Sequence, residues 1–181
     1  NNLYVCILNN NMLKGENNLQ LLTETRRIVI TMHHKPDGDA LGSSLGLYHY
    51  LKNENHEVSI VTSSDYPDFL DWMPGCEDVI IYPQQVELSQ NLLAEAEIIF
   101  CLDYSALSRT NILEPLIAES KGQKWMIDHH LDPEEFADLT YWDSNAAATA
   151  QLIYTFIADI LKSKEKINAN IANCLYAGIM T

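Results

Sequence analysis

Short apolar runs alternate with longer segments of helical periodicity along most of the chain. The apolar runs are rich in Val and Ile, as buried strands are, and they predict strands at 27–33, 57–62, 78–82, 97–103, 124–130 and 138–143. Apolar residues spaced three or four apart predict helices at 39–52, 86–97, 146–162 and 167–180, with another after 105–108 that Pro115 interrupts. The turn-rich segment 65–78 is predicted to be a loop with room for one helical turn.

This alternation indicates an α/β fold, with a mostly parallel sheet and helices on both faces. In such sheets, ligands bind beyond the carboxyl ends of the strands. Three polar groups lie at predicted strand ends: His33 after the first strand, Asp103 after the fourth, and Asp128-His129-His130 after the fifth. We therefore expect a functional site at this edge of the sheet.

The composition suits one globular domain, or one domain and a fragment of a second, and it limits the possible partners. The chain has 181 residues, of which 47% are hydrophobic, and its net charge is -14. A protein that coats duplex DNA needs a basic face, so the charge excludes that class. A nucleotide substrate stays compatible, because bound cations reverse the local field. No apolar run reaches the roughly 18–20 residues of a membrane span, so we expect no membrane partner.

The cysteines and the start of the chain predict a cytoplasmic protein. Cys6, Cys76, Cys101 and Cys174 match no zinc or redox spacing, and three of them lie in apolar settings. We interpret them as buried free thiols in a reducing compartment. The opening NNLYVCILNN lacks the basic segment and the long apolar core of a signal peptide.

The stretch HHKPDGDALGS at 33–43 combines two imidazoles and two carboxylates within seven residues. Asp37 and Asp39 would point into one small volume if they lie in a tight turn before a helix. Carboxylates with imidazoles suit Mn²⁺, and also Co²⁺ and Zn²⁺. No thiolate is nearby, which argues against a structural zinc site.

The other two strand ends offer the remaining parts of a two-cation site. Two ions held about 3.5–4 Å apart by a shared carboxylate can activate a bridging hydroxide for in-line attack on phosphorus. Asp103 is the candidate for the shared carboxylate, and His129 or His130 would complete the second ion. Each group alone also has a structural interpretation, as a polar turn, a helix cap or a half-buried strand end. Their common placement favours the metal site.

Together these motifs resemble those of the DHH phosphoesterase family, which is named for its Asp-His-His motif. The first family motif, H-x-x-P-D-G-D-A-x-G-S, matches residues 33–43, the second is Asp103 in CLDYSALSR, and the third is Asp128-His129-His130. The motifs occur in the family's order, and the resemblance extends from about residue 20 to residue 181. It is to the oligoribonuclease and nucleotide 3',5'-bisphosphate phosphatase branch, the nanoRNase type.

The resemblance implies two divalent cations, taken as Mn²⁺, and a role for each motif residue. His33 and Asp37 would hold one cation, Asp39 and His129 would hold the other, and Asp103 would bridge them. Side chains alternate between the faces of a strand, so His34 should point to the face opposite His33. We therefore expect His34 to pack at the edge of the sheet and to hold no cation.

Other roles implied by the resemblance concern the substrate. His130 would be a catalytic group facing the substrate phosphate or the leaving oxygen, and Asp128 would orient an imidazole from behind. Arg109 would hold phosphate bidentately, although pairing with an acidic neighbour is equally open. Lys35 could contact phosphate, but we expect it to be solvated.

Two segments depart from the family pattern. Where the family has a serine-threonine run at a helix start, this chain has AAATAQ, so only Thr149 keeps a hydroxyl and helix packing is the simpler interpretation. The family's fourth motif, which begins with a metal-binding aspartate, would follow Thr181, and a smaller C-terminal domain is expected beyond it. We therefore divide the chain into an extension at 1–11 and a DHH domain at 12–181, truncated before the fourth motif, and this fragment could be inactive.

The implied activity is Mn²⁺-dependent hydrolysis of short oligoribonucleotides, of nucleoside 3',5'-bisphosphates such as pAp, or of both. Within the family, the alternatives are a pyrophosphatase or exopolyphosphatase and a phosphodiesterase of linear dinucleotides. An aspartyl-phosphate phosphatase also uses D-x-D after a first strand, but leaves the Asp-His-His motif unused. The non-enzymatic alternative is a metal- or nucleotide-binding module. Short RNA or small nucleotides are the expected partners, and a homodimer is left open.

Overall fold

The computed structural model describes residues 6–8 and 11–181, and each predicted strand is present, with both ends within two residues of the expected ones. The strands are β1 (Cys6–Leu8), β2 (Asn11–Lys14), β3 (Arg27–Met32), β4 (Glu57–Thr62), β5 (Val79–Ile81), β6 (Ile98–Leu102), β7 (Gln123–Asp128) and β8 (Leu139–Trp142). The α-helices are α1 (Gly38–Asn53), α2 (Val86–Glu95), α3 (Glu114–Glu119), α4 (Thr149–Thr155) and α5 (Ala169–Met180). Short 3-10 helices cover Glu16–Thr23, Asp68–Leu70, Cys76–Asp78, Tyr82–Gln84, Leu107–Leu113 and Lys164–Lys166, and a π-helix at Phe156–Ile160 continues α4.

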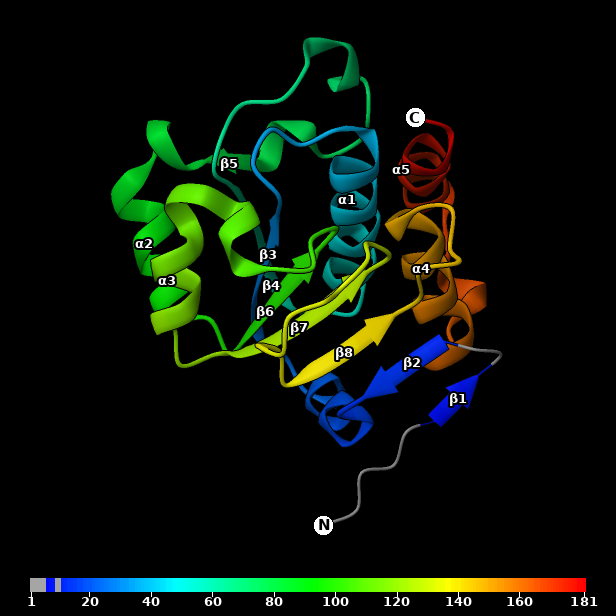
Figure 1. Cartoon of the computed structure of the whole chain (residues 1–181). Helices are drawn as coiled ribbons and strands as arrows, with labels where there is room; N and C mark the ends of the chain where they lie inside the picture. Colours follow the sequence, from blue (N-terminus) through cyan, green and yellow to red (C-terminus); the bar gives the residue numbers. More distant parts are fainter. Residues whose placement is uncertain (1–5, 9–10) are drawn as a thin grey trace.

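The strands form one sheet in the order β1-β2-β8-β7-β6-β3-β4-β5 (Figure 1). All neighbours from β8 to β5 pair in parallel, whereas β2 pairs antiparallel with β8 and β1 antiparallel with β2. The prediction of a mostly parallel α/β sheet is thus confirmed.

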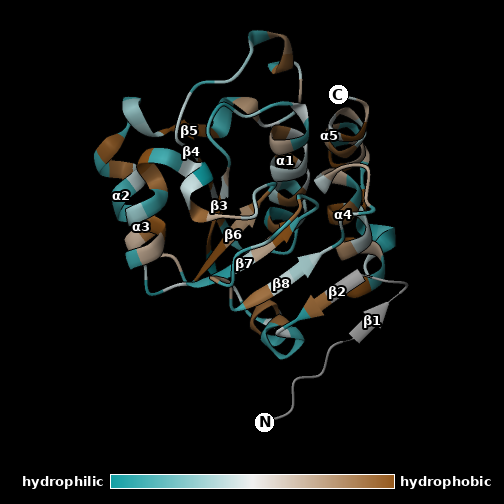
Figure 2. Ribbon diagram, viewed as in Figure 1, coloured by the Kyte–Doolittle hydropathy of each residue, from teal (hydrophilic) through white to brown (hydrophobic). Residues whose placement is uncertain are grey.

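Helices cover both faces of the sheet, with α1, α4 and α5 on one side and α2 and α3 on the other (Figure 1). Alternate residues of β3 point to opposite faces of the sheet. Ile28 and Ile30 pack on the side of α1, and Val29 packs on the side of α2 and α3. Figure 2 shows the central strand β6 as strongly hydrophobic and the covering helices as mixed. Strands buried on both faces read as continuous apolar runs, which is why their positions were predictable.

Two helices differ from their predicted form for identifiable reasons. The helix expected from residue 146 begins only at Thr149, because Ala148 is extended and the backbone N–H of Ala147 donates to Gln151 Oε1 instead. Pro115 does not interrupt a helix; it lies in the first turn of α3, where its missing N–H has no partner to lose.

The chain before residue 15 contains strands that the sequence did not predict. Strands β1 and β2 lengthen the sheet beyond β8, with Leu13 opposite Tyr141. The expected extension at 1–11 therefore includes ordered strand residues, while 1–5 and 9–10 lie outside the described residues, and the domain boundary at 12 stays a prediction. Among described side chains, Cys76, Cys101 and Cys174 are buried free thiols, as expected. Within the described chain, no helix has the length and apolar character that crossing a membrane requires.

Candidate metal centre

Six titratable side chains converge beyond the carboxyl ends of three neighbouring strands. They come from the ends of β3, β6 and β7 and from the start of α1, and they are His33, Asp37, Asp39, Asp103, His129 and His130. The two parts of this cluster, His33–Asp37–Asp103 and Asp103–His129–His130, each bring possible ligand atoms within 4.8 Å of one another. All the residues expected to hold cations are thus gathered at the predicted edge of the sheet.

Asp103 lies at the centre of the cluster. Its Oδ2 is 3.5 Å from His33 Nε2, and its Oδ1 is 3.6 Å from His129 Nε2. Each imidazole has a second carboxylate nearby, because Asp37 Oδ1 is 3.8 Å from His33 Nε2 and Asp39 Oδ2 is 3.5 Å from His129 Nε2. The two oxygens of one buried carboxylate therefore face two separate His–Asp pairs.

The backbone at Asp103 takes a left-handed conformation with φ 63°, and its N–H donates to Ile127 O at 3.2 Å. Aspartate is among the few residues other than glycine that adopt this conformation readily. Such outliers often mark functional positions. The side chain does not cap the following helix, because its oxygens face His33, His129 and Thr149.

The Asp37–Asp39 turn forms the start of α1. Asp37 Oδ1 accepts the N–H groups of Asp39 and Ala40, both at 3.1 Å, so the carboxylate caps the helix. Lys35 carries a positive φ of 55°, whereas Gly38 is the first residue of α1. Gly38 is needed because a Cβ there would collide with the side chain of Thr181 at the end of α5.

The first turn of α4 holds two of the carboxylates. The N–H groups of Thr149 and Ala150 donate to Asp39 Oδ2 and Oδ1 at 2.7 and 2.8 Å. The fully buried Thr149 hydroxyl donates to Asp103 Oδ1 at 2.8 Å. Helix packing was the simpler expectation for this segment, and it is wrong for Thr149, which touches the cluster directly.

Two histidines are held with Nε2 directed at the carboxylates. His33 Nδ1 lies 2.9 Å from His34 O, and His129 Nδ1 lies 3.1 Å from Ala146 O. A carbonyl can only accept, so each Nδ1 carries the proton, and in the neutral ring Nε2 is left with its lone pair. This is the tautomer that a metal-binding imidazole needs.

His130 is arranged differently from His129. Its Nδ1 lies 2.8 Å from Oδ1 of Asp128, which is fully buried, and its side chain remains 36% exposed. Burial raises the pKa of Asp128, although the bond to His130 opposes this. Asp128 Oδ2 has no hydrogen-bond partner among the described residues. Asp128 thus orients the His130 ring through Nδ1, and Nε2 of His130 has no hydrogen-bond partner among the described residues.

The carboxylates crowd one another, and this shifts their protonation. Burial and the charge of Asp103 raise the pKa of Asp39 to about 7. Burial lowers the pKa of His33, but bonding to Asp103 and Asp37 outweighs it and raises that pKa to about 10. The bond to His33 lowers the pKa of Asp37 to about 2.

Histidines are the only cations that pair with these carboxylates among the residues that the structure describes. Without another cation the cluster retains protons, which is the electrostatic setting that divalent ions relieve. The donor atoms and the charge thus both fit divalent cations.

Three other candidates lie at the margin of the cluster. His34 turns away and contacts Ser63 Oγ through Nδ1 at 3.1 Å, in agreement with its expected exclusion. Its N–H donates to the carbonyl of Arg109 at 2.8 Å, so the loop after β6 is tied to the first motif. The Arg109 side chain is exposed and forms no ion pair within the described chain, and its contact with phosphate stays a prediction. Lys35 is exposed, as expected.

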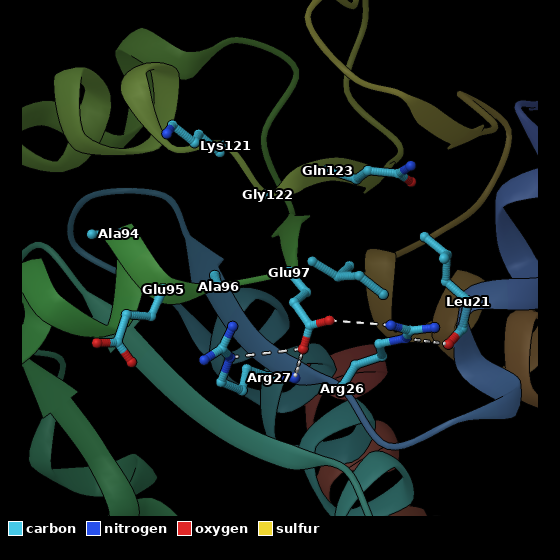
Figure 3. A pocket seen from close by; sticks show the side chains of 11 residues that line it. Leu21, Arg26, Arg27, Ala94, Glu95, Ala96, Glu97, Lys121, Gly122 and Gln123 are labelled. Atoms are coloured by element: carbon cyan, nitrogen blue, oxygen red, sulfur yellow. Dashed lines mark hydrogen bonds and ion pairs between the residues drawn. The ribbon is translucent and has the colours of Figure 1, made fainter.

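A hollow of about 420 Å³ lies at the opposite end of the sheet, where β3, β6 and β7 begin (Figure 3). Glu97 there accepts from Arg26 Nη1 at 3.1 Å and from the Arg27 N–H at 3.0 Å, and it lies 3.7 Å from Arg27 Nε. Arg26 also donates to Leu21 O and Glu24. Arg26, Arg27 and Glu97 therefore pair with one another at this end of the sheet.

Comparison with known proteins identifies the family of the chain. Residues 27–179 match the model of the DHH family, N-terminal domain. The bifunctional oligoribonuclease and PAP phosphatase NrnA of Thermus thermophilus is 36% identical over 154 residues, which are 85% of this chain and 42% of that protein. Its Bacillus subtilis counterpart is 24% identical over 84% of this chain and 45% of that protein.

Solved structures agree with this result. An exopolyphosphatase-related protein from Bacteroides fragilis superimposes with a TM-score of 0.88 and 38% identity, over 92% of this chain and 49% of that one. RecJ of Thermus thermophilus in complex with Mn²⁺ shares the fold, at a TM-score of 0.55 and 16% identity, over 96% of this chain and 24% of RecJ. This chain spans less than half the length of each of these relatives.

Proposed function

The chain belongs to the DHH family, and from that premise we propose that it is the catalytic N-terminal domain of a phosphoesterase that hydrolyses short oligoribonucleotides or nucleoside 3',5'-bisphosphates. The observation that carries the proposal is the carboxylate of Asp103, whose two oxygens face imidazoles from two different strands. The similarity to oligoribonuclease and PAP phosphatase proteins supports the choice of substrate.

We assign two divalent cations to the cluster. His33 and Asp37 would hold one, Asp39 and His129 the other, and Asp103 would contact both. The mixed carboxylate and imidazole donors suit Mn²⁺, and the Nε2 atoms of both histidines are available. When bound, the cations would supply an activated water and positive charge for the phosphoryl oxygens.

His130 is assigned to the substrate rather than to a cation. Its Nδ1 is held by the buried Asp128, so its partly exposed ring has a fixed direction. We infer that His130 in its protonated form donates to a phosphoryl oxygen or to the leaving oxygen, and that Asp128 stabilises this charge. Arg109, on the loop tied to His34, would contact a phosphate that extends from the site.

The division of the protein also remains a proposal. Residues 12–181 would form the DHH domain, and the fourth-motif aspartate and a second, smaller domain would follow. Thr181 packs against Gly38, which lies between Asp37 and Asp39, so a ligand after Thr181 would enter beside the cluster. A cytoplasmic location and a homodimer stay predictions.

The test uses the full-length parent protein with Mn²⁺. Mononucleotide release from a short RNA and phosphate release from pAp should both require the ion and stop with a chelator. Polyphosphate and a linear dinucleotide belong in the panel, because the Bacteroides fragilis relative is described as exopolyphosphatase-related. A protein that binds Mn²⁺ but hydrolyses none of these substrates would instead support a non-catalytic binding module.

A further inference from the structure

A second hollow, of about 310 Å³, borders the loop that carries the first motif, and the proposed hydrolysis does not use it. It is lined by Lys35, Pro36, Asp65, Tyr66 and Pro67. Lys35 and Pro36 lie in sequence between His33 and Asp37, both assigned to one cation. A molecule with its phosphate at the cations would therefore reach this hollow with the group attached to that phosphate.

The walls of the hollow are held by the protein itself. The N–H of Lys35 donates to Ser64 Oγ at 2.7 Å, which joins the loop after β4 to the first motif. On the other side, the Tyr66 hydroxyl donates to Cys76 O at 3.2 Å, and its N–H donates to Asp65 Oδ1. The half-buried Tyr66 ring is thus fixed, so a ligand would bind without ordering the loop first.

The lining favours a flat, uncharged group over a second phosphate. An aromatic ring and two prolines offer apolar surface, whereas the carboxylate of Asp65 repels an anion and accepts from an exocyclic amino group. The exposed Lys35 lines this hollow and lies two residues after His33, and its ammonium can pair with a phosphate oxygen. A nucleobase linked to a phosphate matches both parts.

We propose that this hollow binds the base of the nucleotide whose phosphate is hydrolysed, with Tyr66 as the stacking surface. The inference rests on the proposed function and makes it more specific: the enzyme would recognise nucleotides by their base rather than phosphoesters in general. Stacking on aromatic side chains is tolerant of sequence, so one enzyme could accept different bases.

The experiment compares pAp with ribose 3,5-bisphosphate, the same molecule without a base, in the full-length protein with Mn²⁺. The wild type should show a KM about tenfold lower for pAp, the size expected for one stacked base. Tyr66→Ala should lose most of this preference, with the larger change in the KM for pAp. Tyr66→Phe keeps the ring and should keep the preference.

Two controls separate the possible results. Tyr176→Ala removes an exposed tyrosine from α5, outside the hollow, and should behave as wild type. Melting curves show whether each variant is folded. Equilibrium dialysis with AMP should show about tenfold weaker binding to Tyr66→Ala. If the wild type hydrolyses both bisphosphates equally well, or Tyr66→Ala loses both equally, the base site is wrong while the phosphoesterase stands. If the wild type hydrolyses neither bisphosphate nor a short RNA, the proposed function is overturned as well.

Discussion

The two ends of this sheet handle charge in opposite ways. At the amino ends of β3 and β6, Arg26 and Arg27 share Glu97, and each charge has an opposite partner. At the carboxyl ends of the same strands, the partly buried Asp39 and the buried Asp103 have imidazoles as their only cationic partners among the described residues. One end is arranged for stability, and the other keeps an unfavourable arrangement that a bound cation would relieve.

Protonation follows the same contrast. The bonds from the Arg27 N–H and the Arg26 guanidinium lower the pKa of Glu97, so that end favours the charged form. Burial and Asp103 raise the pKa of Asp39 to about 7, so the other end resists it. Shifts of pKa that disfavour the charged form are typical of functional sites. We therefore expect substitutions within the cluster to have larger effects than substitutions at the other end of the sheet.

The largest effect is expected for Asp103→Asn. Loss of the central charge should reduce the activity of the full-length protein by about a thousandfold or more, the scale seen when an essential group is removed. Because the change also removes one of several crowded negative charges, the metal-free chain should melt no lower than wild type. Activity assays and thermal melting without metal test this pair. A strong loss of stability would show that Asp103 is structural, and the contrast between the two ends would fail.

The second prediction concerns pH and Mn²⁺. The pKa of Asp39 is raised from its unfolded value, so its contribution to the stability of the metal-free chain should be lost as pH rises from about 4 to about 7. The raised pKa of His33 acts in the same direction from about 6.5 to about 10. Melting temperature should therefore fall with pH in this range and be restored by Mn²⁺, with protons released on binding. Asp39→Asn should flatten the lower part of the profile.

A third, smaller effect is expected for Thr149. Thr149→Val removes the hydroxyl that donates to Asp103 at almost constant volume, and Thr149→Ser retains it. Groups that hold metal ligands typically contribute about 10- to 100-fold to metal affinity. Calorimetric Mn²⁺ titration should show this loss for Thr149→Val and recovery for Thr149→Ser. Equal weakening in both variants would point to packing alone.

The sequence predicted the centre of the molecule better than its margins. Double-sided burial makes β3, β6 and β7 continuous apolar runs, and the strand-end rule then brings His33, Asp103 and His129 together without any contact information. Strand β2 lacks that signal, because its four residues, NMLK, are too few and too mixed to form an apolar run.

Contacts that depend on long-range packing could not be predicted from the sequence either. The hydroxyl of Thr149 meets Asp103, 46 positions away in the chain, only because α4 begins three residues later than its alanine-rich sequence suggests. Gly38 likewise lies against the side chain of Thr181, with which a Cβ at Gly38 would collide, and no local pattern shows this approach.

The smallest effect should come from the other end of the sheet. Glu97→Gln weakens the pairs with Arg26 and Arg27, and partly exposed pairs of this kind contribute at most about 1 kcal/mol. The melting temperature should fall slightly, and less at high salt, where the pair is screened in wild type as well. Activity and Mn²⁺ affinity should remain those of wild type, because Glu97 precedes β6 while Asp103 follows it. If Glu97→Gln instead reduced Mn²⁺ affinity as Thr149→Val is expected to, the two ends of the sheet would be coupled, and the division between a stabilising and a functional end would have to be abandoned.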